Sequence, residues 1–329
     1  MQSGQLRRRE FITLFGGAVA WPLAAGAQQP AGNVPKIGVL WPGVIPPVSP
    51  RMESFRRGLR EQGFVDGRNV IIELRYAQEG PHRLADHAAE FVHMNVNVIY
   101  TAGDLAPKIA QQMTRTIPII AIADDILGAG LIANLSRPGG NLTGVTILAP
   151  ELSAKRLQVL KSVFPAIKRV AALSDSSTGT AQALMTRNAA EFLDVGLQVI
   201  EVRRREDLVP AFEAALKEGA EALNVFSSPF LSSIYREIID LAAEKRLPAI
   251  YQWREHVDAG GLLSYGPNLA EMWRQSAVMV AKVLAGANPA EMPVEQPTKI
   301  DLVVNQKTAK ALGLELPLPL LIRADDVID

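Results

Sequence analysis

Short apolar runs alternate with helical segments along almost the whole chain, and this alternation limits its possible folds more than any other feature. Residues 36–40 form the first run, and residues 170–173 open a second series built on the same outline. Strands that are apolar throughout are typical of parallel sheets covered by helices on both faces. The pattern therefore predicts an α/β fold with two similarly built lobes.

The apolar runs and the helical periodicity between them give specific expectations. The predicted strands are residues 36–40, 70–74, 96–100, 117–122, 142–147, 170–173, 197–202, 222–226, 249–250, a short strand before Gly266, and 299–304. The predicted helices are residues 51–62, 83–94, 104–113, 152–164, 182–193, 208–217, 231–245 and 269–284, with a short helix and a proline-rich tail after residue 304.

Residues 259–268 (AGGLLSYGPN) read as a crossover between the lobes, where a buried strand meets a Gly-Pro turn before a long amphipathic helix. Glycine relaxes such a turn and proline cannot extend a strand ladder. Ligands of open α/β sheets bind beyond the carboxyl ends of the strands, so Tyr265 is expected to face a cleft. The alternative is a strand end packed under a helix.

Composition and missing motifs exclude several classes of function. The 329 residues include 34 basic and 34 acidic side chains and no cysteine, which argues against a nucleic-acid surface and excludes disulfides, a catalytic thiol and thiolate metal sites. The sequence lacks the glycine-rich nucleotide loops and the G-x-S-x-G elbow, and its four histidines form no H-E-x-x-H pair. We expect neither an enzyme nor a bound cofactor or metal.

The first 27 residues resemble an export signal. Three arginines precede an apolar run from Phe11 to Ala25, and a small-residue cleavage pattern ends at Ala27. Arg8 and Arg9 begin a stretch (RREFI) that resembles the twin-arginine motif, with a general secretory leader as the alternative. The mature chain is expected to begin at Gln28 in the periplasm.

Five motifs, in order, carry a resemblance to a known family. They are residues 137–144 (RPGGNLTG), 246–250 (RLPAI), 260–267 (GGLLSYGP), 296–305 (QPTKIDLVVN) and 307–314 (KTAKALGL). Together they resemble the substrate-binding proteins of ABC importers, a family that includes tryptophan- and other aromatic-amino-acid-binding members.

The resemblance implies a type I periplasmic binding protein, with two doubly wound parallel-sheet lobes, a three-segment hinge and a ligand enclosed on closure. Lobe one is expected at residues 34–148 plus 267–297, and lobe two at 149–266 plus 298–329. The implied partners are a small-molecule ligand and an ABC permease in the inner membrane, without nucleic acid, and the protein is expected to be a monomer. An exported sensor that presents a ligand to a receptor, and an enzyme on the same fold, are the alternatives.

Aromatic residues near strand ends are the first candidates for ligand contacts. Trp41 follows the first strand and Phe226 ends a strand of the second lobe, and each either stacks on an apolar ligand or belongs to the core. With Tyr265 they predict a small amino acid or carboxylate with an aromatic or branched side chain, and a sugar is the alternative.

Polar candidates lie in the same loops. Thr101 and Ser228 precede helix starts, where backbone N–H groups bind carboxylates, although helix capping alone explains both. Ser174 ends a strand of the second lobe. Asp124 suits a ligand ammonium group or a solvated loop, and Arg254 suits a ligand carboxylate or an exposed surface position.

Overall fold

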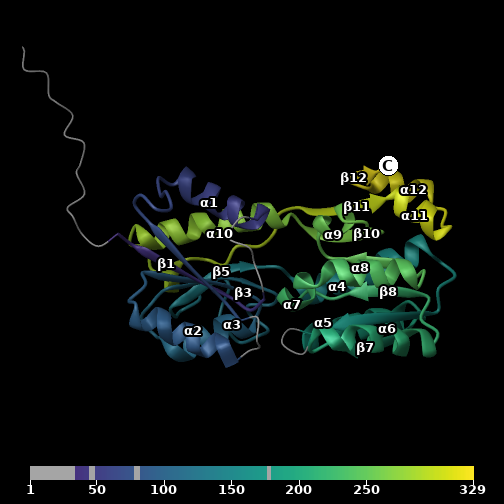
Figure 1. Ribbon diagram of the computed structural model, residues 1–329, viewed down its shortest axis with the longest axis horizontal. Coiled ribbons are helices and arrows are strands. Elements are labelled where there is room, and N and C mark those ends of the chain that lie inside the picture. The colour runs from purple at the N-terminus through teal and green to yellow at the C-terminus, as the bar shows by residue number, and fades with distance from the viewer. Residues whose placement is uncertain (1–33, 44–48, 78–81, 176–178) are drawn as a thin grey trace, which may run out of the picture. The chain divides into compact units, whose positions relative to one another are not determined.

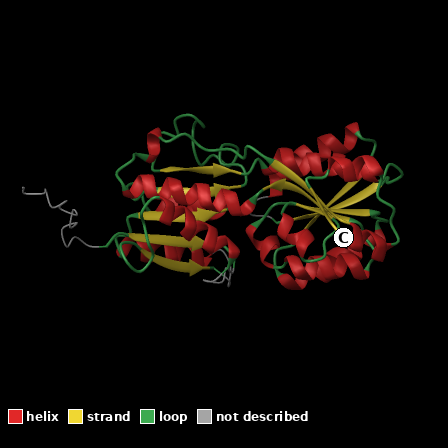
Figure 2. Cartoon of the chain, turned by 90° about the horizontal axis from the view of Figure 1, so that it is seen from above, coloured by secondary structure: helices red, strands yellow, loops and turns green. Residues whose placement is uncertain are grey.

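The computed structural model describes residues 34–43, 49–77, 82–175 and 179–329, and this part of the chain holds two sheets, each between helices (Figures 1 and 2). The first sheet is parallel throughout and has the strand order β2-β1-β3-β4-β5. Its strands are β1 (Lys36–Trp41), β2 (Ile71–Tyr76), β3 (Val98–Ala102), β4 (Ile119–Ala123) and β5 (Leu142–Thr146).

Both faces of the first sheet are covered by helices. One face packs under α1 and α10 in a core that contains Phe55 and Trp273, and the other packs on α2 and α3 through residues such as Phe91. The helices are α1 (Pro50–Glu61), α2 (His82–His93), α3 (Leu105–Met113) and α10 (Leu269–Leu284), and the short turn η2 (Pro289–Glu291) follows α10. This double burial explains why the strands read as continuous apolar runs.

The second sheet repeats the order of the first and then extends it. Its order is β7-β6-β8-β9-β10-β11-β12, and every pairing is parallel except that of β10 with β11. Its strands are β6 (Arg169–Ser174), β7 (Gly196–Glu201), β8 (Ala222–Val225), β9 (Ala249–Tyr251), β10 (Leu263–Pro267), β11 (Ile300–Asn305) and β12 (Asp326–Ile328). The predicted α/β fold with two similar parallel-dominated sheets is confirmed.

The helices of the second sheet also lie on two faces. Residues of α6 and α8 share one core with β6, β8 and β9, and residues of α4, α11 and α12 share the other with β10 and β11. The elements are α4 (Ala149–Val163), α5 (Gly179–Phe192), η1 (Arg205–Asp207), α6 (Leu208–Lys217), α7 (Pro229–Ser233), α8 (Tyr235–Glu244), α9 (Arg254–Asp258), α11 (Gln306–Leu312) and α12 (Leu318–Arg323).

The described chain passes between the two sheets three times: from β5 to α4, from β10 to α10, and from η2 to β11. At the second crossing Asn268 accepts a hydrogen bond from the Glu271 N–H and begins α10. Just before it, a Cβ at Gly266 would overlap the Gln252 carbonyl oxygen, so this position requires glycine. The lobe boundaries and the hinge at these crossings stay predictions.

Helix α10 packs closely against α1, which covers the first sheet. A Cβ at Gly58 of α1 would overlap the carbonyl oxygen of Arg274 in α10, and Arg274 also binds Glu61 of α1 at 2.6 Å. The Tyr100 hydroxyl of β3 lies 2.9 Å from the Ser276 hydroxyl of α10. Helix α10 therefore belongs to the core of the first sheet, although its sequence follows a strand of the second.

Two predicted elements differ from the structure. The helix predicted over residues 231–245 is two helices, α7 and α8, because the chain turns at Ile234 and the Ser233 hydroxyl donates to the Phe230 carbonyl, which competes with helix bonding. The tail predicted after α11 contains α12 and strand β12. Asp325 fixes this strand by exchanging hydrogen bonds with the Leu302 backbone.

The predicted export signal lies outside the described residues. Among the residues that are described, no helix combines the length and the apolar character needed to cross a membrane.

Candidate functional site

The two sheets present their carboxyl strand ends to one small cavity of about 30 Å³. Its lining comes from the ends of β1, β3, β4 and β5 in the first sheet, from the loops after β8 and β9 and the helix α7 in the second, and from α1 and α10. The lining residues are Trp41, Arg51, Ala102, Gly103, Ile122, Asp124, Ile147, Ser227, Ser228, Pro229, Ser232, Trp253, Leu269 and Trp273. This is the place where doubly wound folds bind ligands.

Side chains and loops of the two sheets touch at this cavity. The loop after β3 lies against the start of α7, since a Cβ at Gly103 would be 3.0 Å from Pro229 Cγ. The Ser227 hydroxyl, beyond β8, donates to the Asp124 carboxylate, beyond β4. Ligand sites typically measure about 300–1,000 Å³. An amino acid therefore fits only if these contacts open.

Three tryptophans form much of the apolar wall. Trp41 ends β1, Trp253 follows β9 and Trp273 lies in the first turns of α10, and all three are buried. The rings of Trp41 and Trp273 have centroids 4.8 Å apart and planes inclined by 41°. Such rings offer a large apolar surface and a negative π face to a ligand.

Asp124 is a buried carboxylate with unused bonding capacity. Its Oδ1 accepts from Ser227, while its Oδ2 has no hydrogen-bond partner in the described part of the chain. Burial raises the pKa of Asp124 well above its ordinary value, and the nearby carboxyl of Asp104 raises it further. A buried acceptor of this kind suits a donor that a ligand supplies.

Further carboxyl groups surround Asp124. Burial raises the pKa of Asp104 to about 6, even though its Oδ1 accepts the backbone N–H groups of Asp124 and Asp125. Asp175, beyond β6, accepts a hydrogen bond of 2.7 Å from the Ser228 hydroxyl. Carboxyl groups from both sheets therefore act on Asp124, the acidic residue of the lining, and this local excess of acidic groups favours a cationic ligand group.

Arg156 of α4 is the buried cation whose charge acts on Asp124. Its guanidinium donates to the Ser153 hydroxyl at 2.7 Å, and at 3.4 Å to Asn224 Oδ1 and the Tyr265 carbonyl. Burial lowers the pKa of Arg156 to about 9, and the Asp124 charge acts in the opposite direction. These contacts hold the Arg156 side chain between α4 and the second sheet, and Arg156 does not line the cavity.

Arg51 lines the cavity from the first turn of α1. It is half-buried, and its guanidinium forms no hydrogen bond or ion pair with any residue of the described segments. Burial lowers the pKa of Arg51, while the charge of Glu255 opposes this shift.

Three of the predicted ligand residues, Trp41, Asp124 and Ser228, line the cavity. Ser228 also caps α7, because its hydroxyl accepts the Leu231 N–H at 3.0 Å. Ser174 is buried at the end of β6 and is absent from the lining.

The structure does not bring the other four predicted residues to the lining. Tyr265 packs against the apolar core between the second sheet and α4, because its neighbours in β10 alternate between faces. Thr101 and Phe226 are buried elsewhere at strand ends. Arg254 is exposed and binds Asp326 at 2.6 Å.

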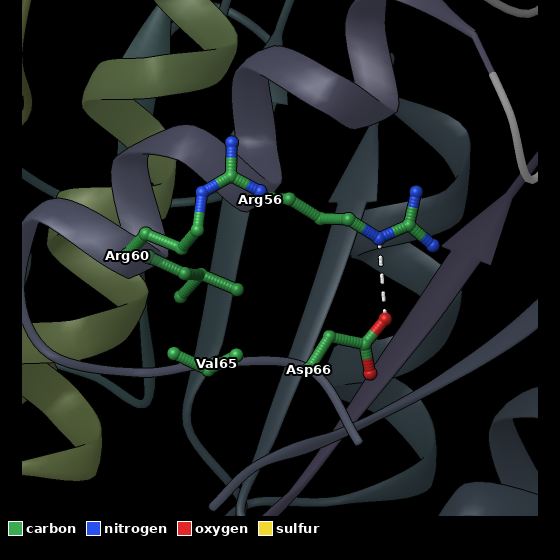
Figure 3. A pocket seen from close by; sticks show the side chains of 5 residues that line it. Arg56, Arg60, Val65 and Asp66 are labelled. Carbon is green, nitrogen blue, oxygen red and sulfur yellow. Dashed lines mark hydrogen bonds and ion pairs between the residues drawn. The ribbon is translucent and has the colours of Figure 1, made fainter. Parts of the chain in front are cut away.

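A larger pocket of about 160 Å³ lies on α1 and the loop before β2 (Figure 3). Arg56 and Asp66 face each other across it with a 3.2 Å ion pair. This pocket lies at the amino end of β2, opposite to the end where such sheets bind ligands. The described residues also contain no cluster of three potential metal-ligating side chains.

Comparisons with known proteins identify the family of the chain. Residues 36–328 match the family model described as ABC transporter substrate binding protein. A protein named tyrosine-binding protein from Clostridioides difficile (strain R20291) is 25% identical over 280 residues, covering 82% of this chain and 78% of the relative.

Solved structures show the same fold. The ABC domain in complex with L-Trp from Streptococcus pneumonia has a TM-score of 0.82 at 24% identity, covering 89% of this chain and 99% of that one. A conserved domain protein from Vibrio cholerae has a TM-score of 0.81 at 24% identity, with the same coverage of both chains.

Proposed function

Because this chain belongs to the ABC transporter substrate-binding protein family, whose members bind ligands and are not enzymes, we propose that it binds an amino acid with an aromatic side chain. The site is the cavity at the facing strand ends. The observation that carries the proposal is the tryptophan wall beside Asp124, whose Oδ2 has no partner among the described residues. The relatives named for tyrosine and solved with L-Trp support the same ligand class.

The energetics suit such a ligand. Burying an aromatic side chain against the wall contributes about 1.5–3 kcal/mol, and a charge-assisted hydrogen bond to Asp124 contributes about the same. With further bonds to the ligand's carboxylate, micromolar affinity is reachable after the costs of association. A sugar carries neither an ammonium group to pair with Asp124 nor an aromatic ring to bury against the tryptophans.

Binding requires motion, because the cavity of about 30 Å³ is about tenfold smaller than a typical ligand site. The proposed hinge is the set of three crossings between lobe one (residues 34–148 and 267–297) and lobe two (149–266 and 298–329). The lobes must first separate enough to admit the ligand, and a ligand that touches both lobes then favours the form that encloses it and shifts the population toward that form.

The proposed setting is import. After export and removal of residues 1–27, the protein would deliver its ligand to an ABC permease in the inner membrane. The alternative is an exported sensor that presents the ligand to a receptor. Deletion of the adjacent permease gene, if one exists, would abolish ligand uptake in the first case and leave uptake unchanged in the second.

Calorimetry tests the ligand class directly. Purified protein should bind L-Trp or L-Tyr with micromolar or tighter affinity, and Trp41→Ala should weaken this binding at least tenfold because it removes part of the wall. Phe192→Ala is the matched control, since that ring is 87% exposed on α5. Tight binding of a sugar without binding of any aromatic amino acid would contradict the proposal.

A further inference from the structure

The cavity has two charged ends supplied by different elements. Asp124 follows β4 and offers a carboxylate oxygen without a partner, while Arg51 enters from α1 and offers a guanidinium without one, both within the described residues. The apolar wall that contains Trp41 and Trp273 belongs to the same lining. A site with separate anionic and cationic groups matches a ligand that carries both charges.

Arg51 is unusual among the half-buried arginines of the described chain. Arg75 makes a two-pronged contact with Glu90, and Arg274 binds Glu61 and Glu271 at 2.6 Å each. Arg51 forms no such pair, and even Glu255, whose charge acts on it, makes no ion pair with it. Its fork of donors is therefore available to a planar carboxylate, which guanidinium groups bind through two parallel hydrogen bonds.

The position of Arg51 in its helix adds to this preference. Ser49 caps α1 by accepting the Met52 N–H at 3.2 Å, and Pro50 begins the helix, so Arg51 lies in the first turn. The amino end of a helix carries partial positive charge and favours an anion. Arg156, the other candidate cation, is occupied by protein contacts and lies outside the lining.

We propose that Arg51 binds the α-carboxylate of the ligand while Asp124 binds its α-ammonium group, so that the site selects zwitterionic amino acids over aromatic amines and aromatic acids. This inference rests on the proposed function and assigns to each of the two residues the ligand group that it binds. Loss of one charged group from the ligand should cost as much as loss of its partner from the protein.

The test is a binding matrix measured by calorimetry. The probes are L-Trp, tryptamine, which lacks the carboxylate, and indole-3-propionate, which lacks the ammonium group; the L-Tyr series is measured in parallel. Arg51→Gln should weaken L-Trp binding roughly 10- to 100-fold and leave tryptamine binding unchanged. Asp124→Asn should weaken L-Trp binding to a similar degree and leave indole-3-propionate binding unchanged.

Two further variants separate charge recognition from folding. Arg51→Lys keeps the charge but loses the fork, and it should give an intermediate affinity. Arg57→Gln is the matched control on the exposed face of α1, where Arg57 pairs with Glu61 at 3.9 Å, and it should bind L-Trp as the unaltered protein does.

The outcomes distinguish this inference from the proposed function. If Arg51→Gln weakens L-Trp and tryptamine binding equally, or weakens neither, the carboxylate role of Arg51 is overturned while aromatic amino-acid binding stands. If the unaltered protein binds neither L-Trp nor L-Tyr, both are overturned.

Discussion

Replacing Asp124 by asparagine should stabilise the protein and impair its binding. The substitution keeps the side-chain shape and the oxygen that accepts from Ser227. It removes a buried ionisable carboxyl group whose second oxygen lacks a partner in the described chain and which lies near the carboxyl groups of Asp104 and Asp175. The two effects have opposite signs, so they can be measured separately.

The magnitudes follow from the same contacts. A buried polar group without a partner costs about 1–3 kcal/mol, so the free energy of unfolding without ligand should rise by about 1–2 kcal/mol at pH 7. Loss of the charge-assisted bond to the ligand's ammonium group should cost about 1.5–3 kcal/mol, or roughly 10- to 100-fold in affinity. Urea denaturation measures the first quantity and calorimetry with L-Trp measures the second.

Protons should be linked to this binding step. The raised pKa of Asp124 means that the ligand-free site retains a proton to a higher pH than an exposed aspartate does. A bound ammonium group favours the charged carboxylate, so binding should release a proton, and affinity should increase as the pH rises through the elevated pKa. Calorimetry in two buffers of different ionisation enthalpy counts the protons, and Asp124→Asn should reduce that count.

The same shift sets how the stabilisation by asparagine depends on pH. A carboxyl group whose pKa is raised by folding contributes its full stability when the pH is below 3.8, the pKa of the group in the unfolded chain. This contribution is lost as the pH rises through the pKa of the folded state. The advantage of Asp124→Asn should therefore be larger at pH 7 than at pH 4. Charged neighbours on both sheets, Asp104, Asp175 and Arg156, shape the titration.

Asp125→Asn is the matched control. Asp125 is half-buried, lies outside the cavity lining, and would keep an oxygen to accept the Gly128 N–H. The control should leave affinity unchanged. A lower urea midpoint of ligand-free Asp124→Asn would contradict the stability prediction, and unchanged affinity of this variant for L-Trp would contradict the binding prediction.

Three other predictions concern stability and export. His256 is buried, and burial lowers its pKa to about 3. The neutral side chain therefore contributes its full stability above pH 6.5, and this contribution falls by about 1.4 kcal/mol per pH unit toward pH 3. His256→Phe should reduce the difference between the urea midpoints measured at about pH 7 and at about pH 5. Gly58→Ala should cost about 1–3 kcal/mol in urea denaturation through overlap with Arg274, whereas Gly140→Ala, with open space around it, should cost little. N-terminal sequencing of periplasmic protein should begin at Gln28, and retention of residues 1–27 would contradict the cleavage prediction.

The sequence alone was sufficient for the fold class and many element boundaries. Apolar periodicity located α6 and α10 with the bounds the structure has, since each helix buries one continuous stripe. The motifs that resemble the binding-protein family led to the family that the chain belongs to. Position after a strand also placed Trp41, Asp124 and Ser228 at the cavity, because parallel strands end at one edge of their sheet.

Only the tertiary structure decided which side chains meet. Strand alternation leaves open which face of β10 lies toward the ligand, and the structure turns Tyr265 into the core of the second sheet. Trp273 and Arg51 reach the cavity because α10 crosses back and packs on α1, a contact between residues more than two hundred positions apart. The periodicity of a local sequence predicts which residues of a helix or strand are buried. The residues that pack against them depend on the path of the chain between the two sheets, which local periodicity does not predict.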